Sequence, residues 1–457
     1  MRTRITKDQL KSPAGFGDWS PEQASALDHM LGIIREQYML AGFTPMHTPL
    51  VERPEILFAK AQGEVTNQVY GLRLMKPAEN SPTDEKNLAI RFDHTVPLAR
   101  FVAANQGEMV FPFRRCAIGP VVRGEHPKDG RYREFIQADV DVIGDKTLSF
   151  DHDAEMISII SSVFDKLAFG PFTIRINNRK LLTGYLGSIG CETPDVVRRA
   201  VNIVDDLEKK GRTETLQNLA DLGIEENNAQ HALEFLTRSY TIEEAFEELR
   251  SLEYGKEFAT GVAELETVID SVRQFGIPAS RYCIDLSIAR GLNYYTSTVY
   301  EAQLDDYPDL GSIAGGGRYD NLADDFSPRH LPGVGVSIGV TRLLRRLIKM
   351  GIVEIKSKTV AKVLVASRDF QTEKELHLSR ASLLRSAGIP TEAFLEKRDL
   401  GKQLNFAARR GMKVVVFTHH GNDDHDAGRK IVVRNLEQGD QIIVPEADLV
   451  VTVQSML

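Results

Sequence analysis

One segment of this 457-residue chain, Glu134–Gly144 (EFIQADVDVIG), alternates between aliphatic and polar side chains. Because successive side chains of a β-strand point to opposite faces, the pattern predicts a strand with one aliphatic face. The other face would carry Phe135, Gln137, Asp139 and Asp141. The polar side of such a sheet either lines a cavity or faces solvent, and the segment alone does not decide between the two.

The residues before this strand favour the cavity. Arg123, Arg131 and Arg133 surround a loop with glycine and proline that joins two strand-like runs, and Glu125 lies in the same loop. The planar fork of an arginine suits phosphate and carboxylate groups. Arginines beside a carboxylate-bearing strand therefore predict a ligand that is both phosphorylated and cationic.

Two further segments are typical of ligand sites. Consecutive glycines at 315–320 (GGGRYD), with 289–295 (ARGLNYY) upstream, let a backbone and a ligand approach closely, although such clusters are also common in turns. Residues 334–343 (VGVSIGVTRL) predict a strand running into a helix, with Arg342 in its first turn. A helix N-terminus and an arginine together favour an anion; the alternative is an arginine on a solvated helix face.

The last segment also matches the GxSxG pattern of a serine hydrolase, with Ser337 as the nucleophile. The histidines that could complete such a site, His419 and His420, stand in polar, Asp-rich sequence typical of a surface loop in a separate domain. We therefore favour anion binding. The chain has no GxxxxGK[ST] loop, no GxGxxG opening a βαβ unit and no HExxH, so ATP, if bound, would be held by arginines on a sheet.

Composition limits the class of protein. With 42% hydrophobic and 26% charged residues, the chain is not disordered, collagen-like or a coiled coil, and its length predicts about three domains. Cys116, Cys191 and Cys283 form no CxxC pair, so we predict neither structural zinc nor a disulfide framework. We see no secretory signal and no run of about 18 apolar residues, and we expect a cytoplasmic protein with no membrane partner.

The pattern of apolar and charged residues changes along the chain. Short apolar runs at 85–144 and 281–343 predict strands, whereas 175–275 is charged and helical in pattern. Capping boxes predict helix starts at Ser20 and Thr241. After a charged segment at 353–359, strand-like and helical runs alternate, which predicts a compact α/β domain of about 100 residues.

These motifs resemble those of a known family. Arg123-x-Glu125, followed by Arg131-x-x-x-Phe135, is similar to motif 2 of the class II aminoacyl-tRNA synthetases. Residues 335–342 are similar to motif 3, and Pro49 stands where motif 1 has its dimer-interface proline. Residues 91–95 (RFDHT), 290–295 (RGLNYY) and 315–320 are similar to blocks peculiar to histidyl-tRNA synthetase, and a match at 388–416 extends the resemblance over essentially the whole chain.

The resemblance implies an α+β fold: a class II synthetase-type catalytic domain on an antiparallel sheet, with a helical insertion and a C-terminal α/β domain of the anticodon-binding type. The implied limits are 1–172 for the first part of the catalytic domain, 173–278 for the insertion, 279–352 for the second part and 359–457 for the anticodon-binding domain.

The resemblance also implies the activity of a histidine–tRNA ligase. L-Histidine and ATP would give histidyl-adenylate and pyrophosphate, and the histidyl group would then move to the 3′ end of tRNA(His). ATP would be a substrate accompanied by Mg²⁺, with no bound organic cofactor, and no protein ligands to a metal are identified. The resemblance further implies a homodimer.

Residue roles transfer from the resemblance to matching positions. Arg123 and Arg290 would be catalytic, holding the α-phosphate and the substrate carboxylate. Arg123 would also bind ATP together with Glu125 and Phe135 at the adenine and Arg342 at the γ-phosphate. Histidine would contact Arg123 and Arg290. Its ammonium would be held by Asp93, Thr95 and Gln137, and its imidazole by Asp141 and Tyr295. Tyr294 and Tyr319 would line the pocket.

The sequence departs from the commonest family pattern at several positions. Asn293 stands where Asp is usual, Thr341 replaces an acidic residue, and Ile136 takes a place often held by His. Asp93 and Asp141 are shorter than the Glu of many bacterial members. A rival interpretation is the synthetase-like regulatory subunit of ATP phosphoribosyltransferase, which generally lacks the C-terminal domain and the ATP arginines; both are present here.

The net charge of −8 argues against a nucleic-acid partner only at first sight. Residues 361–457 hold 14 Lys and Arg against 13 Asp and Glu, so this region is at +1 and the acidic excess lies elsewhere. Within it, a basic cluster could contact tRNA phosphates, unless it is simply a solvated helix face. The candidate tRNA-binding residues are Lys397, Arg398, Lys402, Arg409 and Arg410.

Overall fold

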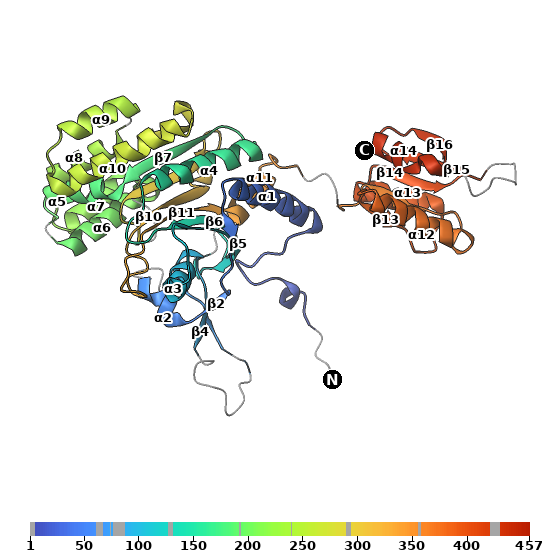
Figure 1. Cartoon of the computed structure of the whole chain (residues 1–457), viewed down its shortest axis with the longest axis horizontal. Helices are drawn as coiled ribbons and strands as arrows, with labels where there is room; N and C mark the ends of the chain where they lie inside the picture. Colours follow the sequence, from blue (N-terminus) through green and yellow to red (C-terminus); the bar gives the residue numbers. More distant parts are fainter. Residues whose placement is uncertain are drawn as a thin grey trace. The chain divides into compact units, whose positions relative to one another are not determined.

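The computed structural model describes residues 5–60, 67–73, 75, 87–126, 131–191, 193–238, 240–288, 294–354, 358–420 and 430–457. The chain forms two compact units (Figure 1). The large unit is Met1–Gly17 with Met30–Ile352, and the small unit is Asp18–His29 with Val353–Leu457. Within the described ranges, no helix is long and apolar enough to cross a membrane.

An eight-stranded sheet in the order β1-β5-β6-β11-β10-β9-β7-β8 forms the frame of the large unit. Its six inner strands pair antiparallel, and the short edge strands β1 and β8 pair parallel with β5 and β7. The strands are β1 Thr44–Pro45, β5 Phe113–Val122, β6 Glu134–Ile143, β7 Phe172–Asn178, β8 Tyr282–Ile284, β9 Thr298–Leu304, β10 Ala314–Tyr319 and β11 Gly333–Gly339. The alternating segment of the sequence is therefore a strand, as predicted.

The two faces of this sheet differ in the way the alternation of the sequence predicts. Ala138, Val140 and Val142 of β6 are fully buried. Arg318 and Tyr319 are neighbours on β10 and point to opposite faces: Arg318 forms a bidentate ion pair with Asp153 of helix α4 (Asp151–Leu167), whereas Tyr319 faces the polar residues of β6. Helix α4 thus closes one face, and the polar side of β6 lies on the other.

The large unit also contains a three-stranded sheet in the order β2-β4-β3. Arg91, just after β4, binds the carbonyls of Thr48 at 2.7 Å and Pro120 at 3.0 Å and so joins the two sheets. The elements here are β2 Val51–Glu52, α2 Pro54–Lys60, β3 Gly71–Leu72, β4 Leu88–Ile90 and α3 Thr95–Asn105.

Helices fill the chain between β7 and β8, as the charged, helical pattern of residues 175–275 predicts. The capping box at Thr241 and Glu244 is present, and so is the reciprocal bonding of Ser20 and Gln23 at the start of α1. The helices are α5 Arg179–Ser188, α6 Pro194–Asp205, α7 Leu207–Asp221, α8 Glu226–Thr237, α9 Ile242–Ser251 and α10 Gly255–Gln274. Outside this segment, α1 is Pro21–Leu40 and α11, which continues directly from β11, is Val340–Lys349.

The small unit is an α/β sandwich on a five-stranded sheet, β13-β12-β14-β15-β16. Alternate residues of the same strands enter two separate apolar clusters: Val414 and Val416 pack with α12 and α14, whereas Val415 and Phe417 pack with α13. Burial on both faces explains why these strands are continuous apolar runs in the sequence. The elements are β12 Val363–Val365, α12 Phe370–Ser386, β13 Thr391–Ala393, α13 Leu400–Arg410, β14 Val414–Thr418, β15 Lys430–Asn435, β16 Gln441–Pro445 and α14 Leu449–Ser455.

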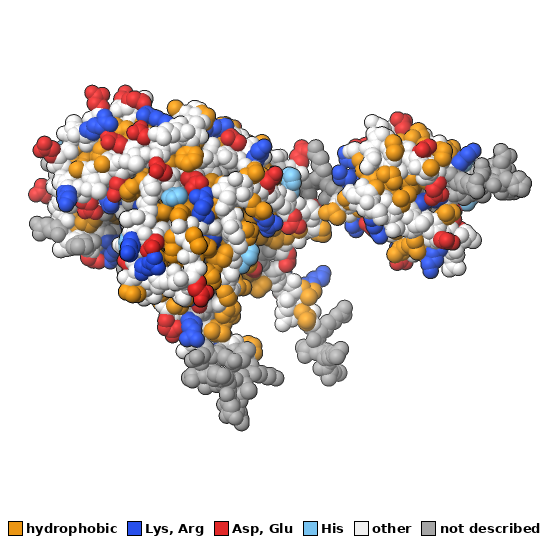
Figure 2. Space-filling model, viewed as in Figure 1, with side chains coloured by type: hydrophobic (Ala, Val, Ile, Leu, Met, Phe, Trp, Pro, Cys, Tyr) orange, Lys and Arg blue, Asp and Glu red, His pale blue; other side chains and the backbone are white. Residues whose placement is uncertain are grey.

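The architecture confirms the predicted fold class, with a large, mainly antiparallel sheet and a C-terminal α/β unit. Charged side chains of both signs are interspersed over the visible face of each unit (Figure 2). The net charge of −8 therefore does not reflect one continuous acidic surface on this face.

Candidate active site

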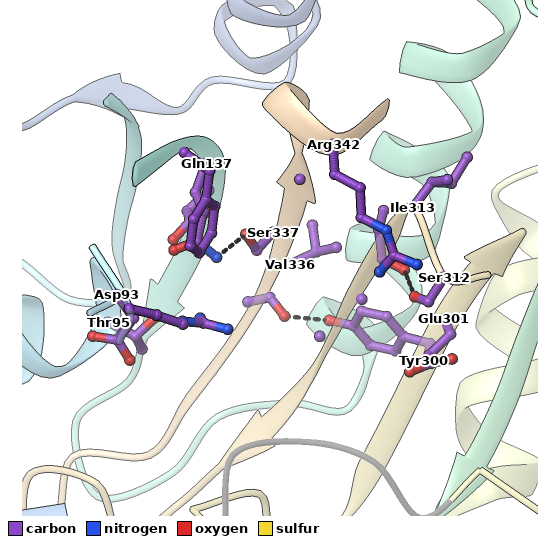
Figure 3. Close-up of a pocket in the computed structure, with 18 of the residues that line it drawn as sticks. Asp93, Thr95, Gln137, Tyr300, Glu301, Ser312, Ile313, Val336, Ser337 and Arg342 are labelled. Atoms are coloured by element: carbon purple, nitrogen blue, oxygen red, sulfur yellow. Dashed lines mark hydrogen bonds between the residues drawn. The ribbon is translucent and has the colours of Figure 1, made fainter. Parts of the chain in front are cut away.

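A cavity of about 340 Å³ lies over the polar face of the central strands β6, β10 and β11 (Figure 3). It brings together predicted residues from places far apart in the sequence. Arg290 and Asn293 fall outside the residues that the structure describes, and every other predicted histidine- or ATP-binding residue lines the cavity: Asp93, Thr95, Arg123, Glu125, Phe135, Gln137, Asp141, Tyr294, Tyr295, Tyr319 and Arg342.

Strand pairing sets the floor of the cavity. Along β6 and β11, Asp141 pairs with Gly335 and Asp139 with Ser337. A Cβ atom on Gly335 would stand 2.3 Å from Asp141 Oδ1 and 2.7 Å from the Val140 carbonyl oxygen. Only glycine lets the Asp141 carboxylate lie flat against the neighbouring strand.

Asp141 is held in a fixed position by two partners. Arg115 of β5, its cross-strand neighbour, forms an ion pair with it at 2.9 Å, and the Tyr319 hydroxyl donates to Oδ1 at 2.5 Å. Arg115 and Asp141 are both 2% exposed. Burial raises the pKa of Asp141, and the Arg115 guanidinium opposes that shift.

Arg115 was not among the residues predicted from the sequence. Arg123, Arg131 and Arg133 could be recognised in the sequence because they surround a loop and match a motif. Arg115 lies within an ordinary strand-like run. It becomes recognisable only when β5 and β6 are paired in register, because the pairing places its guanidinium opposite Asp141.

Asp93 lies at the start of helix α3. Its Oδ1 accepts a hydrogen bond from the Val96 backbone N–H at 3.1 Å, and the Tyr294 hydroxyl is 3.5 Å from Oδ2. Burial raises the pKa of Asp93 to about 6, although the Val96 N–H and the Arg123 guanidinium both favour its charged form. The carboxylate is therefore available to a cation at neutral pH.

Polar acceptors without partners line the middle of the cavity. The Gln137 amide donates to Ser337 Oγ at 2.9 Å, and Ser337 also hydrogen-bonds Asp139. Gln137 Oε1 and Asp139 Oδ1 are buried and have no hydrogen-bond partner among the described residues. Because buried acceptors are rarely left unpaired, they indicate a ligand that brings donors. The Ser337 hydroxyl bonds to Gln137 and Asp139. This arrangement is not the catalytic triad of a serine hydrolase.

The opposite end of the cavity is basic. Arg342 from the first turn of α11 lies there beside Ser312 and Glu301 (Figure 3), and its guanidinium donates to the Leu310 carbonyl at 2.6 Å. Arg123, beyond the end of β5, donates to the Phe92 carbonyl at 3.0 Å, and its guanidinium lies 5.2 Å from the centre of the Phe135 ring. Arg342 thus marks a basic end, whereas Arg123 lies close enough to Asp93 to favour its charged form.

The departure at Thr341 has a structural explanation. Its Oγ1 accepts a hydrogen bond from the Ile136 backbone N–H at 2.8 Å, which ties the start of α11 to β6. Thr341 is 2% exposed. A hydroxyl meets this single donor without burying a further charge.

The described flanks of the segment that carries Arg290 are firmly held. The Asn177 amide, 1% exposed, donates to the carbonyls of Leu286 at 3.1 Å and Ile288 at 2.8 Å. On the other side, Thr296 Oγ1 donates to Asp320 at 2.7 Å. Neither Asn177 nor Thr296 was predicted from the sequence, because nothing local marks a residue that bonds to a distant backbone.

The basic cluster of the small unit divides between a loop and a helix. Lys397 and Arg398 lie in the loop after β13, and Lys402, Arg409 and Arg410 lie on α13. All are exposed except Arg410, which is half-buried. Lys402 pairs with Asp399 at 3.2 Å and Arg410 approaches Glu392 at 3.7 Å, so carboxylates partly offset the charge of these two residues.

The antiparallel catalytic-type sheet and a cavity that combines buried carboxylates with arginines define a class II aminoacyl-tRNA synthetase. The family model described as histidyl-tRNA synthetase matches residues 15–343. The chain therefore belongs to the histidyl-tRNA synthetase family.

Similarity to individual relatives extends over nearly the whole chain. The chain is 39% identical to the histidine–tRNA ligase of Nostoc sp., and the match covers 97% of this chain and 97% of that protein. It is 38% identical to the histidine–tRNA ligase of Xanthomonas axonopodis pv. citri, and the match covers 97% of this chain and 95% of that protein. The crystal structure of histidyl-tRNA synthetase from Nostoc sp. PCC 7120 matches with a TM-score of 0.86 at 38% identity, covering 99% of this chain and all of that one.

A structure from Bacillus halodurans, described as an ATP phosphoribosyltransferase regulatory subunit/histidyl-tRNA synthetase, matches with a TM-score of 0.70 over 89% of this chain. At 19% identity this likeness concerns the fold alone. The fold is thus common to both interpretations drawn from the sequence, and the relatives at 38–39% identity favour the ligase.

Proposed function

We propose that the cavity carries out the histidine–tRNA ligase reaction with the residue roles set out below. The protein is an aminoacyl-tRNA ligase that uses ATP, as its family membership and its relatives indicate. In the first step a carboxylate oxygen of histidine bonds to the α-phosphorus of ATP and pyrophosphate leaves. In the second step a ribose hydroxyl at the 3′ end of tRNA(His) bonds to the histidyl carbonyl and AMP leaves.

The observation that carries the proposal is the polarity of the cavity. Attack of a carboxylate on a phosphate brings two anions together, so positioning and fixed positive charge supply most of the catalysis. The cavity holds buried carboxylates and unpaired acceptors at one end and Arg342 at the other, with Arg123 near Asp93. A zwitterionic amino acid fits between them with its ammonium toward Asp93 and its carboxylate toward Arg123.

Histidine would be held as follows. Asp93, Thr95 and Gln137 would bind the ammonium, a role that the unpaired Gln137 Oε1 supports. Asp141 and Tyr295 would bind the imidazole, and Tyr294 and Tyr319 would line the pocket around it, where their rings already pack edge to face at 5.8 Å. Buried polar partners of this kind reject apolar isosteres, whose binding would leave them unpaired.

ATP would bind over β6 and β11. Phe135 would stack on the adenine and Glu125 would accept from its amino group. Arg123 would hold the α-phosphate together with Arg290, and Arg342, at the N-terminus of α11, would hold the γ-phosphate. The role of Arg290 comes from the family resemblance alone.

We further propose that ATP enters with Mg²⁺. In the described part of the chain, no three His, Cys, Asp or Glu side chains form a group that could hold a metal ion. Mg²⁺ in nucleotide sites typically takes one or two carboxylates together with phosphate oxygens and waters, and Glu301, at the basic end beside Ser312, fits that requirement. The ion would neutralise charge on the phosphates when bound.

The remaining proposals concern assembly. A homodimer would form around Pro49, beside which Leu50 is an exposed apolar side chain; Met39 and Leu40, at the end of α1, are exposed as well. Residues 173–278 would be the helical insertion and 359–457 the domain that binds the anticodon stem of tRNA(His), in a cytoplasmic enzyme. Sedimentation tests the dimer, and deletion of 359–457 tests the tRNA role: it should weaken tRNA charging and leave adenylate formation largely intact.

Steady-state pyrophosphate exchange of two variants tests the residue roles. Gln137→Leu should raise KM for histidine about 10-fold or more with little change in KM for ATP, because it removes a buried acceptor. Arg342→Met should do the reverse. If both variants change the same constant, the assignment of the two ends is wrong.

A further inference from the structure

The acidic end of the cavity contains one more carboxylate than the roles above employ. Asp139 lies between Gln137 and Asp141 on the same face of β6, is 3% exposed and lines the cavity. Its Oδ1 has no hydrogen-bond partner among the described residues. Asp141, in contrast, has both an arginine and a tyrosine.

The surrounding charges do not compensate Asp139. Its charged neighbours are Arg115, Arg91, Asp93 and Asp141. Arg115 is paired with Asp141, and the Arg91 guanidinium is occupied by the backbone carbonyls of Thr48 and Pro120. Ser337 of β11 supplies a hydroxyl and no charge. Burial and the repulsion of Asp141 raise the pKa of Asp139 to about 7, so the free site holds this carboxyl near its ionisation point.

The geometry matches a ligand group with two donors. Asp139 and Asp141 are two residues apart on one strand, which places their Cα atoms about 7 Å apart on the same face. A flat five-membered ring fits between two such carboxylates. Neutral imidazole has one N–H and one acceptor nitrogen, whereas imidazolium has two N–H donors. With neutral imidazole, one ring nitrogen would turn its lone pair toward a carboxylate.

We infer that Asp139 is a further specificity-determining residue of the histidine site and that Asp139 and Asp141 together bind the side chain of histidine as imidazolium, one ring N–H to each carboxylate. This inference rests on the proposed function, in which the ligand is histidine. Asp93 keeps the ammonium, and Asp139 takes the ring nitrogen that the roles above give to Tyr295. The two positive groups of the bound amino acid, its ammonium and its imidazolium, leave Asp93 and Asp139 each with one positive partner.

The inference has a proton balance that can be measured. At about pH 8, free histidine is mainly neutral at its ring and Asp139 is mainly ionised, so binding takes up about one proton per histidine. At about pH 5.5, the ring, Asp139 and most of Asp93 hold a proton before binding, so between one and two protons are released. Asp93 is already ionised at pH 8 because its pKa is about 6, and the raised pKa of Tyr295 keeps that hydroxyl protonated throughout.

The test is titration calorimetry of the full-length protein with L-histidine, without ATP, at about pH 8 in two buffers that differ in ionisation enthalpy. The wild type should show uptake of about one proton. Asp139→Asn, which keeps the shape and removes the charge, should show none and bind histidine about 10- to 100-fold more weakly. Asp139→Glu is the matched control that keeps the charge and should retain the proton uptake.

A second ligand keeps the inference testable if Asp139→Asn does not fold. The wild type should bind 1,2,4-triazolylalanine, whose ring is not protonated at this pH, at least about 10-fold more weakly than histidine. Equal heats in the two buffers, or wild-type affinity in Asp139→Asn, would overturn the inference. Histidine-dependent pyrophosphate exchange by the wild type would still support the proposed function in that case, so the two failures are distinguishable.

Discussion

Replacing Gly335 by alanine tests how tightly the histidine pocket is built. The added Cβ would stand 2.3 Å from Asp141 Oδ1, 2.8 Å from its Cγ and 2.7 Å from the Val140 carbonyl oxygen. An unstrained contact between a carbon and an oxygen is about 3.3 Å or longer, so the gap must open by about 1 Å. Neither neighbour can give way easily, since Val140 O is backbone and Asp141 is held by Arg115 and Tyr319.

A displacement of about 1 Å in a positioned group can cost about 100-fold in rate. We therefore expect Gly335→Ala to lower kcat/KM for histidine by about 100-fold in pyrophosphate exchange, with KM for ATP much less affected. Overpacking of this kind should also lower the free energy of unfolding of the large unit by about 1–3 kcal/mol. Urea denaturation, followed through the unfolding transition of that unit, measures this change.

Gly339→Ala on the same strand is the control for stability. The nearest atom to its added Cβ is the Ile313 carbonyl oxygen at 3.9 Å, so its unfolding free energy should stay within about 0.5 kcal/mol of the wild type. If Gly335→Ala binds histidine as well as the wild type and unfolds at the same urea concentration, the close contact between β6 and β11 does not fix the position of Asp141.

Three further predictions follow from other parts of the molecule. Asp153→Ala removes the bidentate partner of the buried Arg318 guanidinium, which keeps a longer contact to Asp320, and should cost about 3 kcal/mol of unfolding free energy in urea; a cost below about 1 kcal/mol would contradict this. Burial, reinforced by neighbouring arginines, lowers the pKa of His94 to about 3, so below about pH 6.5 the unfolded chain binds a proton that the folded one excludes. The stability advantage of the wild type over His94→Gln should then shrink as pH falls from about 7 to about 5, and a constant difference would refute it. Lys397→Ala and Arg398→Ala should each weaken tRNA(His) binding and reduce its salt dependence by about one charge, with pyrophosphate exchange unchanged; an unaltered salt slope would exclude them from the tRNA surface.

The parts of the site that depend on local pattern could be predicted from the sequence. The period-two alternation of β6 indicated that Gln137, Asp139 and Asp141 share a face, and they do line one cavity. The strand-to-helix transition at 334–343 placed Arg342 in the first turn of a helix, where the structure has it. Both inferences need only the geometry of a single element.

The partners of these residues could not be predicted in the same way. Arg115 meets Asp141 because of the register between β5 and β6, and Thr341 meets Ile136 because α11 begins beside β6. Such contacts depend on how elements pair in space, which no local pattern specifies. The sequence did not single out the short strands β13 and β16: β13 has three residues, and the aliphatic run of β16 is only three residues long and largely exposed.

The most direct test of the account is pyrophosphate exchange into ATP by the full-length protein, measured with each standard amino acid in turn. The buried carboxylates and the arginines of the cavity predict exchange with histidine, faster than with any other amino acid by a factor of about 10,000. Exchange that is absent with histidine, or as fast with another amino acid, would contradict the assignment of this cavity to histidine activation.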